Sequence, residues 1–248
     1  MKNELLHFIP NVPSTNRLLA QMATEATQKG EHLPEFFALH TDFQSAGHGM
    51  GSNSWFSDKD QNLLVSFYFE PKLPANRQFI FNRYFALATL TFVRRYAPNA
   101  LIKWPNDIYI NGKKMAGDLT EHTLRGDNIH YTIAGIGIDI NQEHFPSNVP
   151  HPTSLFLETH QHYELLPLLE EYWTLLHDNY YRVSLDYDNS LHEEYLQNLY
   201  QYNEFHHYLI HNEDIEASIK NLDSYGRLML EDRNGHSYLC GFKEIVFL

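Results

Sequence analysis

The chain has 248 residues; 43% are apolar, 31 are acidic and 18 are basic, which gives a formal net charge of −13. This composition is typical of a folded protein with one main domain and space for a small appended module, and it excludes a disordered chain. The acidic balance, without a basic stripe, excludes nucleic acid from the expected partners.

The cysteine count and the N-terminus bear on where the protein works. A single cysteine, Cys240, rules out an internal disulfide and a cysteine-based zinc site, and it favours a reducing compartment. The N-terminal MKNELLHFIP has no apolar signal core, and the longest apolar run, residues 84–93, is too short to span a bilayer. We therefore expect a cytoplasmic protein with no membrane partner.

The first predicted element is a helix over residues 17–30, which follows Ser14, Thr15 and Asn16. Ser or Thr is a good N-cap, apolar residues recur at helical spacing, and Gly30 is a plausible stop. Strands are predicted at 36–43 and 62–69, on either side of a Gly/Ser/Asn-rich loop at 45–54. An apolar helix is predicted over 75–97, and Pro98 closes it.

In the second half of the chain, the pattern of predicted elements changes near residue 203. Strands are predicted at 100–104, 107–110, 113–122 and 129–141, and helices at 163–184 and 190–201. Beyond them lie short strand-like segments separated by turn signals, at 206–210, 214–221, 226–232, 236–240 and 243–247. We therefore expect two domains, an α+β domain at 1–202 and a small β-barrel at 203–248.

A hairpin is predicted around Asn111-Gly112, a strong two-residue turn signal. The pairing would place Tyr109 opposite Lys114, Ile108 opposite Met115, and Asp107 opposite Ala116. Because strand side chains alternate between faces, Asp107, Tyr109, Lys114 and Ala116 would share one face. This face is open to two interpretations, a solvated cross-strand ion pair or a functional site.

Two glycines interrupt the strand TIAGIGIDIN at 132–141. Gly135 and Gly137 fall on one face and isoleucines on the other, which indicates a ligand floor; a bulge or tight strand packing is the alternative. The loop at 45–54 lacks both the Walker ending and the dinucleotide fingerprint. Taken alone, it is more typical of a mobile surface loop than of a phosphate site.

Taken together, these segments resemble the biotin protein ligases. The matching motifs are STN at 14–16, QSAGHGMGSNSW at 44–55, KWPND at 103–107, GKKMAG at 112–117 and GIGIDIN at 135–141. HPTSL at 151–155 and the terminal GFKEIVFL fit the family's linker and small C-terminal barrel. The resemblance implies an α+β fold, with a mixed β-sheet and helices of the class II synthetase or biotin–lipoate ligase type, plus a small C-terminal β-barrel.

The resemblance also implies a two-step reaction. Biotin's carboxylate attacks the α-phosphorus of ATP, with Mg²⁺ as cofactor, and a lysine of a biotin carboxyl carrier domain then takes the biotinyl group from the adenylate. The first motif begins near residue 8 and leaves no space for a DNA-binding domain. The resemblance thus implies the monofunctional type without operator binding, and either a monomer or a homodimer.

Site residues are carried over by motif. Catalytic roles are implied for Lys114, Asp107 and Lys103. Contacts to biotin are implied for Ser14, Thr15, Asn16, Gln44, Gly47, His48, Gly49, Met50, Lys114, Gly117 and Gly137. Contacts to the nucleotide are implied for His48, Met50, Asn53, Trp55, Lys103, Asn106 and Asp139. The metal ligands stay open.

The chain departs from the family pattern at several positions. His48, Met50 and Asn53 stand where arginine or lysine is usual, Asp139 replaces an asparagine, and Asp118 replaces an apolar residue. Less positive charge beside a triphosphate predicts a weaker or altered enzyme. Two alternatives therefore stay open: a lipoate or octanoate ligase of the same fold, and a non-catalytic biotin-binding paralogue.

Overall fold

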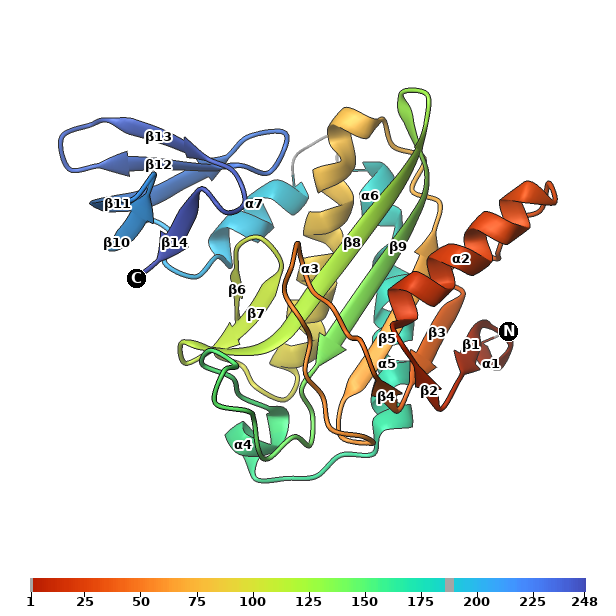
Figure 1. Cartoon of the computed structure of the whole chain (residues 1–248). Coiled ribbons are helices and arrows are strands. Elements are labelled where there is room, and N and C mark those ends of the chain that lie inside the picture. Colours follow the sequence, from red (N-terminus) through yellow and green to blue (C-terminus); the bar gives the residue numbers. More distant parts are fainter. Residues whose placement is uncertain (1, 186–189) are drawn as a thin grey trace.

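The computed structural model describes residues 2–185 and 190–248. Its centre is a seven-stranded sheet in the order β1-β3-β5-β9-β8-β7-β6 (Figure 1). These strands are β1 (Leu6–Phe8), β3 (Ala38–Thr41), β5 (Leu63–Phe69), β6 (Leu101–Lys103), β7 (Asp107–Ile110), β8 (Lys113–Arg125) and β9 (Asn128–Ile138). The β1–β3 pair is parallel and the other pairs are antiparallel, so the sheet is mixed, as predicted.

Helices cover the two faces of the sheet unequally (Figure 1). One face carries the main core, with α3 (Gln78–Arg94) and α5 (Leu165–Asn179), flanked by α6 (Tyr181–Leu185) and α7 (Ser190–Gln197). Among the described residues, the helix on the other face is α2 (Thr15–Gln28), which packs over β3, β5 and β9 through a smaller cluster that includes Leu19 and Tyr68. The remaining part of that face, over β7, β8 and β9, is left for a site.

Helix α2 lies two residues earlier at each end than the predicted 17–30, and its N-cap is one of the residues that the sequence offered. Ser14 is the N-cap, with extended backbone, and its hydroxyl accepts a hydrogen bond from the Arg17 N–H at 3.5 Å. Gly30 adopts a φ of +74° just beyond the helix end, a conformation that glycine reaches without steric strain. The N-cap thus fixes Thr15 and Asn16 in the first turn, where both are buried.

The C-terminal region is a five-stranded antiparallel sheet in the order β13-β12-β11-β10-β14. Its strands are β10 (Phe205–Ile210), β11 (Glu213–Leu222), β12 (Leu228–Asp232), β13 (Ser237–Cys240) and β14 (Ile245–Phe247). The two end strands, β13 and β14, are not paired with each other in the described residues. The predicted small C-terminal β region is present as this sheet. Trp104 Nε1 donates to the Gly226 carbonyl at 2.8 Å and ties this sheet to the main domain.

Several boundaries differ from the predicted ones. The predicted strand 36–43 divides into β3 and β4 (Phe43–Gln44), and the predicted helix 163–184 divides into α5 and α6. The predicted helix 75–97 is a 3-10 turn, η1 (Ala75–Arg77), followed by α3. Four short elements were not predicted: α1 (Lys2–Leu5), β1, β2 (Asn11–Val12) and α4 (Leu155–Thr159). None of the described helices combines the length and hydrophobicity needed to cross a membrane.

Candidate ligand-binding site

A cavity of about 590 Å³ lies on the open part of the sheet, between α2 and the C-terminal sheet. Its size is within the usual range for small-molecule sites. Nearly all the residues singled out in the sequence line it: Ser14, Thr15, Asn16, Gln44, His48, Gly49, Met50, Asn53, Trp55, Lys103, Asn106, Asp107, Lys114, Gly117 and Gly137. Gly47 and Asp139 line a neighbouring cavity instead, which shares Gln44, Trp55 and Lys114 with the first.

The hairpin that carries Lys114 has one more irregularity than predicted. Tyr109 pairs with Lys114 as expected, but Asp107 pairs with Gly117 and Ile108 with Ala116, because a bulge at Met115 shifts the register. Ala116 is therefore in the core, and its predicted place on the face of Asp107 is wrong. Gly117 takes that place, with Lys114 and Trp55 close above it.

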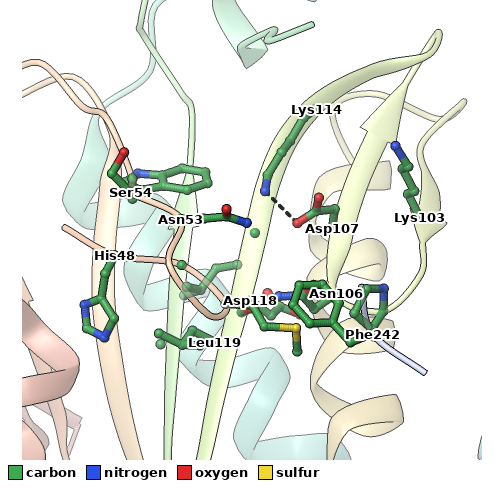
Figure 2. A pocket seen from close by; sticks show the side chains of 18 of the residues that line it. His48, Asn53, Ser54, Lys103, Asn106, Asp107, Lys114, Asp118, Leu119 and Phe242 are labelled. Carbon is green, nitrogen blue, oxygen red and sulfur yellow. Dashed lines mark hydrogen bonds and ion pairs between the residues drawn. The ribbon is translucent and has the colours of Figure 1, made fainter. Parts of the chain in front are cut away.

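Lys114 and Asp107 meet across the hairpin (Figure 2), with Lys114 Nζ 2.6 Å from Asp107 Oδ1. The side chains are 31% and 22% exposed. The stabilisation from such a partly solvated pair is about 0–1 kcal/mol. Lys114 Nζ also lies 5.5 Å from the centre of the Trp55 ring. An anionic ligand can therefore take the Lys114 ammonium from Asp107 with a small loss of stability.

Lys103 is a second cation in the cavity wall. Its Nζ donates to the Tyr109 hydroxyl at 3.2 Å and lies 5.0 Å from the centre of the Phe247 ring, which comes from β14. Burial lowers the pKa of Lys103 from its ordinary value, and the neighbouring Asp107 opposes that shift. Lys103, Asp107 and Lys114 form the lysine cluster, which the C-terminal strand helps to hold.

The glycine-rich loop folds back on itself as a tight hairpin. The Gly49 N–H donates to the Asn53 carbonyl at 2.8 Å, and the Trp55 N–H donates to the Gly47 carbonyl at 3.0 Å. A Cβ on Gly47 would lie 2.8 Å from the Trp55 carbonyl oxygen, so this turn needs glycine. The loop thus brings Trp55 into the cavity, where its Nε1 is a buried donor without a partner in the described residues.

His48 stands on the same loop and reaches back to α2. Its Nδ1 lies 3.2 Å from Ser14 Oγ, so either atom donates according to the histidine tautomer. This contact ties the loop to the N-cap of α2. His48 therefore offers hydrogen bonding where the family pattern has a fixed positive charge.

The side-chain-free face of β9 is covered by two residues of the site. A Cβ on Gly135 would collide with the Asn16 side chain, and a Cβ on Gly137 would collide with the Trp55 ring. Both glycines also line the cavity. The interpretation of this strand as a bare ligand floor is therefore corrected, because the glycines make room for Asn16 and Trp55.

Beside Gly135 lies a group of linked polar side chains, here called the hydroxyl–amide network: Thr15, Asn16, Gln44, Ser66 and Glu121. Ser66 Oγ lies 2.5 Å from Asn16 Oδ1 and 2.7 Å from Thr15 Oγ1. The Asn16 amide donates to Glu121 Oε2 at 2.9 Å, and the Thr15 N–H donates to Gln44 Oε1 at 2.8 Å. Sequence reasoning missed Ser66 and Glu121, although Ser66 is a polar residue within an apolar strand.

Two further carboxyls are almost completely buried near the cavity. Burial raises the pKa of Asp118 well above its ordinary value; the Thr89 hydroxyl, which donates to it at 3.2 Å, opposes the shift. Burial likewise raises the pKa of Asp139, opposed by the positive charge of Lys114. Asp139 Oδ1 has no hydrogen-bond partner among the described residues, so it is available to a cation or a donor.

The comparison that decides the family is the match of residues 10–139, just over half of the chain, to the model of the biotin/lipoate A/B protein ligase family. The chain belongs to this family. The matched residues contain the hydroxyl–amide network, the glycine-rich loop and the lysine cluster. Most of the cavity lining therefore lies within the matched residues.

Curated ligases of this family are similar over part of their length. The bifunctional ligase/repressor BirA of Bacillus spizizenii is 35% identical over 133 residues, which are 51% of this chain and 41% of that relative. The biotin–protein ligase of Schizosaccharomyces pombe is 30% identical over 125 residues, 42% of this chain and 20% of that relative. The matched segment thus spans less than half the length of these relatives.

Solved biotin protein ligases share the fold along the whole chain. The ligase of Aquifex aeolicus in complex with biotin and ATP superposes with a TM-score of 0.75 at 22% identity, over 98% of each chain. The Leishmania major ligase in complex with biotinyl-5-AMP gives 0.64 at 24% identity, over 95% of this chain and 98% of that one. The predicted α+β fold of the biotin–lipoate ligase type is therefore confirmed.

Proposed function

We propose that this member of the ligase family activates biotin with ATP and transfers it to a protein lysine. In the first step a biotin carboxylate oxygen bonds to the α-phosphorus, the bond to the β-phosphate oxygen breaks, and pyrophosphate leaves. In the second step the neutral amine of the acceptor lysine attacks the biotinyl carbonyl carbon, loses a proton, and AMP leaves. Both steps need positioning and neutralisation of charge more than a protein nucleophile.

The observation that carries this proposal is the position of Lys114. Lys114 lines the cavity and also the neighbouring one, with its Nζ 5.5 Å from the centre of the Trp55 ring, so one lysine borders both spaces. A carboxylate and an α-phosphate about 4 Å apart repel each other by a few kcal/mol at intermediate dielectric. The Lys114 ammonium offsets this repulsion when it leaves Asp107, and Lys103 adds a second positive charge on the same wall.

Mg²⁺ is expected with ATP, because this cation is usually held by one or two carboxylates together with the substrate's phosphates. In the described residues no group of three His, Cys, Asp or Glu side chains gathers as a metal cage. Asp139 fits as a single carboxylate ligand, since its Oδ1 is buried without a partner. When bound, Mg²⁺ would neutralise phosphate charge; Asp139 would hold it, and Lys114 would orient the carboxylate.

The alternative substrates are lipoate and octanoate. The polar end of the cavity favours biotin over them, because the hydroxyl–amide network presents hydroxyl and amide groups, not an apolar lining. A dithiolane ring or an alkyl chain would leave the Gln44 NH₂ group and the Thr15 hydroxyl without a ligand partner. The loss is about 1–3 kcal/mol for each group. A non-catalytic paralogue would bind biotin at the same place without forming the adenylate.

The acceptor we propose is the biotin carboxyl carrier domain of a carboxylase. The net charge of −13 supports a partner other than nucleic acid. Cys240 is buried, and burial raises its thiol pKa to about 11, which fits the reducing cytoplasm as the place of reaction. For the oligomeric state, a monomer and a homodimer both stay within the proposal.

The test is direct product detection. Purified protein is incubated with ATP, Mg²⁺ and biotin, and biotinyl-adenylate is sought by mass spectrometry; lipoate and octanoate replace biotin in parallel reactions. We expect the biotinyl-adenylate mass with biotin and subsequent labelling of an added carrier domain. Adenylate from octanoate or lipoate alone would establish the alternative substrate class, and biotin binding without any adenylate would establish the non-catalytic paralogue.

A further inference from the structure

The orientation of the Asn16 amide is fixed by its surroundings. Its nitrogen lies 3.1 Å from the Leu119 carbonyl oxygen and 2.9 Å from Glu121 Oε2. A backbone carbonyl only accepts hydrogen bonds, so the NH₂ group must face it, and Oδ1 must point the other way. Both amide protons are then used, one by Leu119 and one by Glu121. Asn16 Oδ1 is left as a pure acceptor.

The proton of Ser66 follows from this orientation. Ser66 is fully buried, and its Oγ lies 2.5 Å from Asn16 Oδ1. Since Asn16 Oδ1 carries no proton, the single Ser66 proton is donated to it. The 2.7 Å contact between Ser66 Oγ and Thr15 Oγ1 is then a hydrogen bond only if Thr15 donates its own proton to Ser66. Gln44 Oε1, 3.2 Å from Thr15 Oγ1, is the other acceptor within reach of that proton.

These assignments determine which groups at this end of the cavity donate hydrogen bonds to a ligand and which accept them. With its proton used inside the protein, by Ser66 Oγ or by Gln44 Oε1, the Thr15 hydroxyl can only accept from a ligand. Gln44 Oε1 is engaged by the Thr15 N–H at 2.8 Å, so the Gln44 NH₂ group is the end left to donate. Thr15 and Gln44 both line the cavity. This end therefore fits a ligand with an N–H directly beside a C=O, as in a cyclic urea.

We propose that Ser66 and Glu121 are positioning residues, which set the hydrogen-bond polarity of the cavity for a cyclic urea through Asn16 and Thr15. The inference rests on the proposed function, because biotin is the substrate that carries this group. Glu121 holds the Asn16 amide in one orientation, and Ser66 passes that orientation to the Thr15 hydroxyl. Neither Ser66 nor Glu121 lines the cavity, so both act through Asn16 and Thr15.

The variants separate this role from a general loss of packing. Ser66→Ala removes the hydroxyl between Asn16 and Thr15 without adding volume. Glu121→Leu removes the acceptor for the Asn16 amide, whereas Glu121→Gln keeps an acceptor oxygen and serves as the conservative rescue. Thr132→Val is the matched control, because it removes an equally buried hydroxyl on β9 whose partner is His122, away from the cavity.

The measurement is the biotin Kd by calorimetry, together with KM for biotin, KM for ATP and kcat in adenylate formation. We expect Ser66→Ala and Glu121→Leu to raise the biotin Kd and KM about tenfold, with kcat and KM for ATP within about threefold of the parent protein. Glu121→Gln and Thr132→Val are expected to stay within about threefold in every parameter.

Two results would overturn the positioning role. One is a biotin Kd for Ser66→Ala within about twofold of the parent value. The other is an equal rise in KM for biotin and ATP, the signature of a loosened fold. If Glu121→Leu fails to fold, Ser66→Ala decides alone. Failure of the parent protein to bind biotin would instead contradict the proposed function, so the two failures are distinguishable.

Discussion

The two ends of the cavity are built on opposite principles. Thr15, Asn16 and Ser66 of the hydroxyl–amide network are buried, the groups that face the ligand are neutral, and the side chains already hold one another in place. The lysine cluster is partly exposed and charged, and its central contact joins Lys114 to a carboxylate that a ligand can replace. The ring of Trp55 lies over Gly137, between Asn16 at Gly135 and Lys114 above Gly117.

This contrast indicates how recognition and chemistry are divided. A network that leaves defined groups for the ligand, such as the Gln44 NH₂ group, discriminates strongly, because a wrong ligand leaves those groups unpaired. A weak, exposed ion pair discriminates little, but its cation is free to follow charge that develops during the reaction. Substitutions in the network should therefore change affinity for biotin, whereas substitutions in the lysine cluster should change the rate.

The largest effect is expected at the charged end. Lys114→Ala removes the cation that faces both substrates and should slow adenylate formation by on the order of 10²–10³-fold, with a much smaller change in biotin affinity. The matched control is Lys113→Ala, because Lys113 is the neighbouring lysine at the exposed tip of the same hairpin. Single-turnover formation of biotinyl-adenylate measures both. A parent-like rate for Lys114→Ala would show that Lys114 does not act in adenylate formation.

A smaller effect on affinity is expected at the hydrogen-bonded end. Gly135→Ala places a methyl group where the Asn16 side chain now lies, so it displaces Asn16 and disturbs its link to Ser66. We expect the biotin Kd to rise about 10–50-fold, while ATP affinity changes little. Calorimetric titration with each substrate separates the two. Unchanged biotin binding would show that Asn16 does not contribute to this end.

The buried carboxyl between the two ends gives a prediction about pH. Burial raises the pKa of Asp118, so the protonated form stabilises the fold at low pH, and this contribution is lost as pH rises through the raised pKa. Asp118→Asn stays neutral and should be more stable than the parent near pH 8, with the difference vanishing near pH 4. Thermal unfolding across this range checks the sign; a variant that is less stable at high pH would contradict it.

The smallest effect is expected where the C-terminal sheet supports the charged end. Trp104→Phe removes the hydrogen bond from Trp104 Nε1 to the Gly226 carbonyl and keeps most of the aromatic surface. We expect a loss of stability of about 1 kcal/mol, accompanied by a modest rise in KM for ATP and none in the biotin Kd. Urea unfolding and steady-state kinetics measure these changes. A rise in the biotin Kd instead would show that the C-terminal sheet supports the hydroxyl–amide network and not the lysine cluster.

Local patterns predicted much of this architecture. The N-cap at Ser14 and the Asn111-Gly112 hairpin each carry their structural reason within a few residues of sequence. The motif order also predicted which segments would converge on the cavity, and the structure brings nearly all of their residues to its walls. These features depend on local conformation, which is the part of folding that sequence reports most directly.

Long-range geometry accounts for what the sequence did not reveal. The bulge at Met115 is one extra residue in β8 relative to β7, and neither strand's sequence predicts it by itself. The contact of Ser66 with Asn16 joins residues 50 positions apart, and that of Glu121 with Asn16 joins residues 105 apart. The cover over Gly135 and Gly137 likewise comes from α2 and from the glycine-rich loop. Such pairings follow from the assembled sheet and not from spacing along the chain.

The most direct test of the central claim is the exchange of labelled pyrophosphate into ATP, measured with biotin and with octanoate for the parent protein, Lys114→Ala and Ser66→Ala. We expect biotin-dependent exchange in the parent protein and a low maximal rate for Lys114→Ala at any biotin concentration. For Ser66→Ala we expect a parent-like maximal rate that is reached only at about tenfold higher biotin. Exchange that octanoate supports better than biotin, or that Lys114→Ala retains in full, would contradict the central claim.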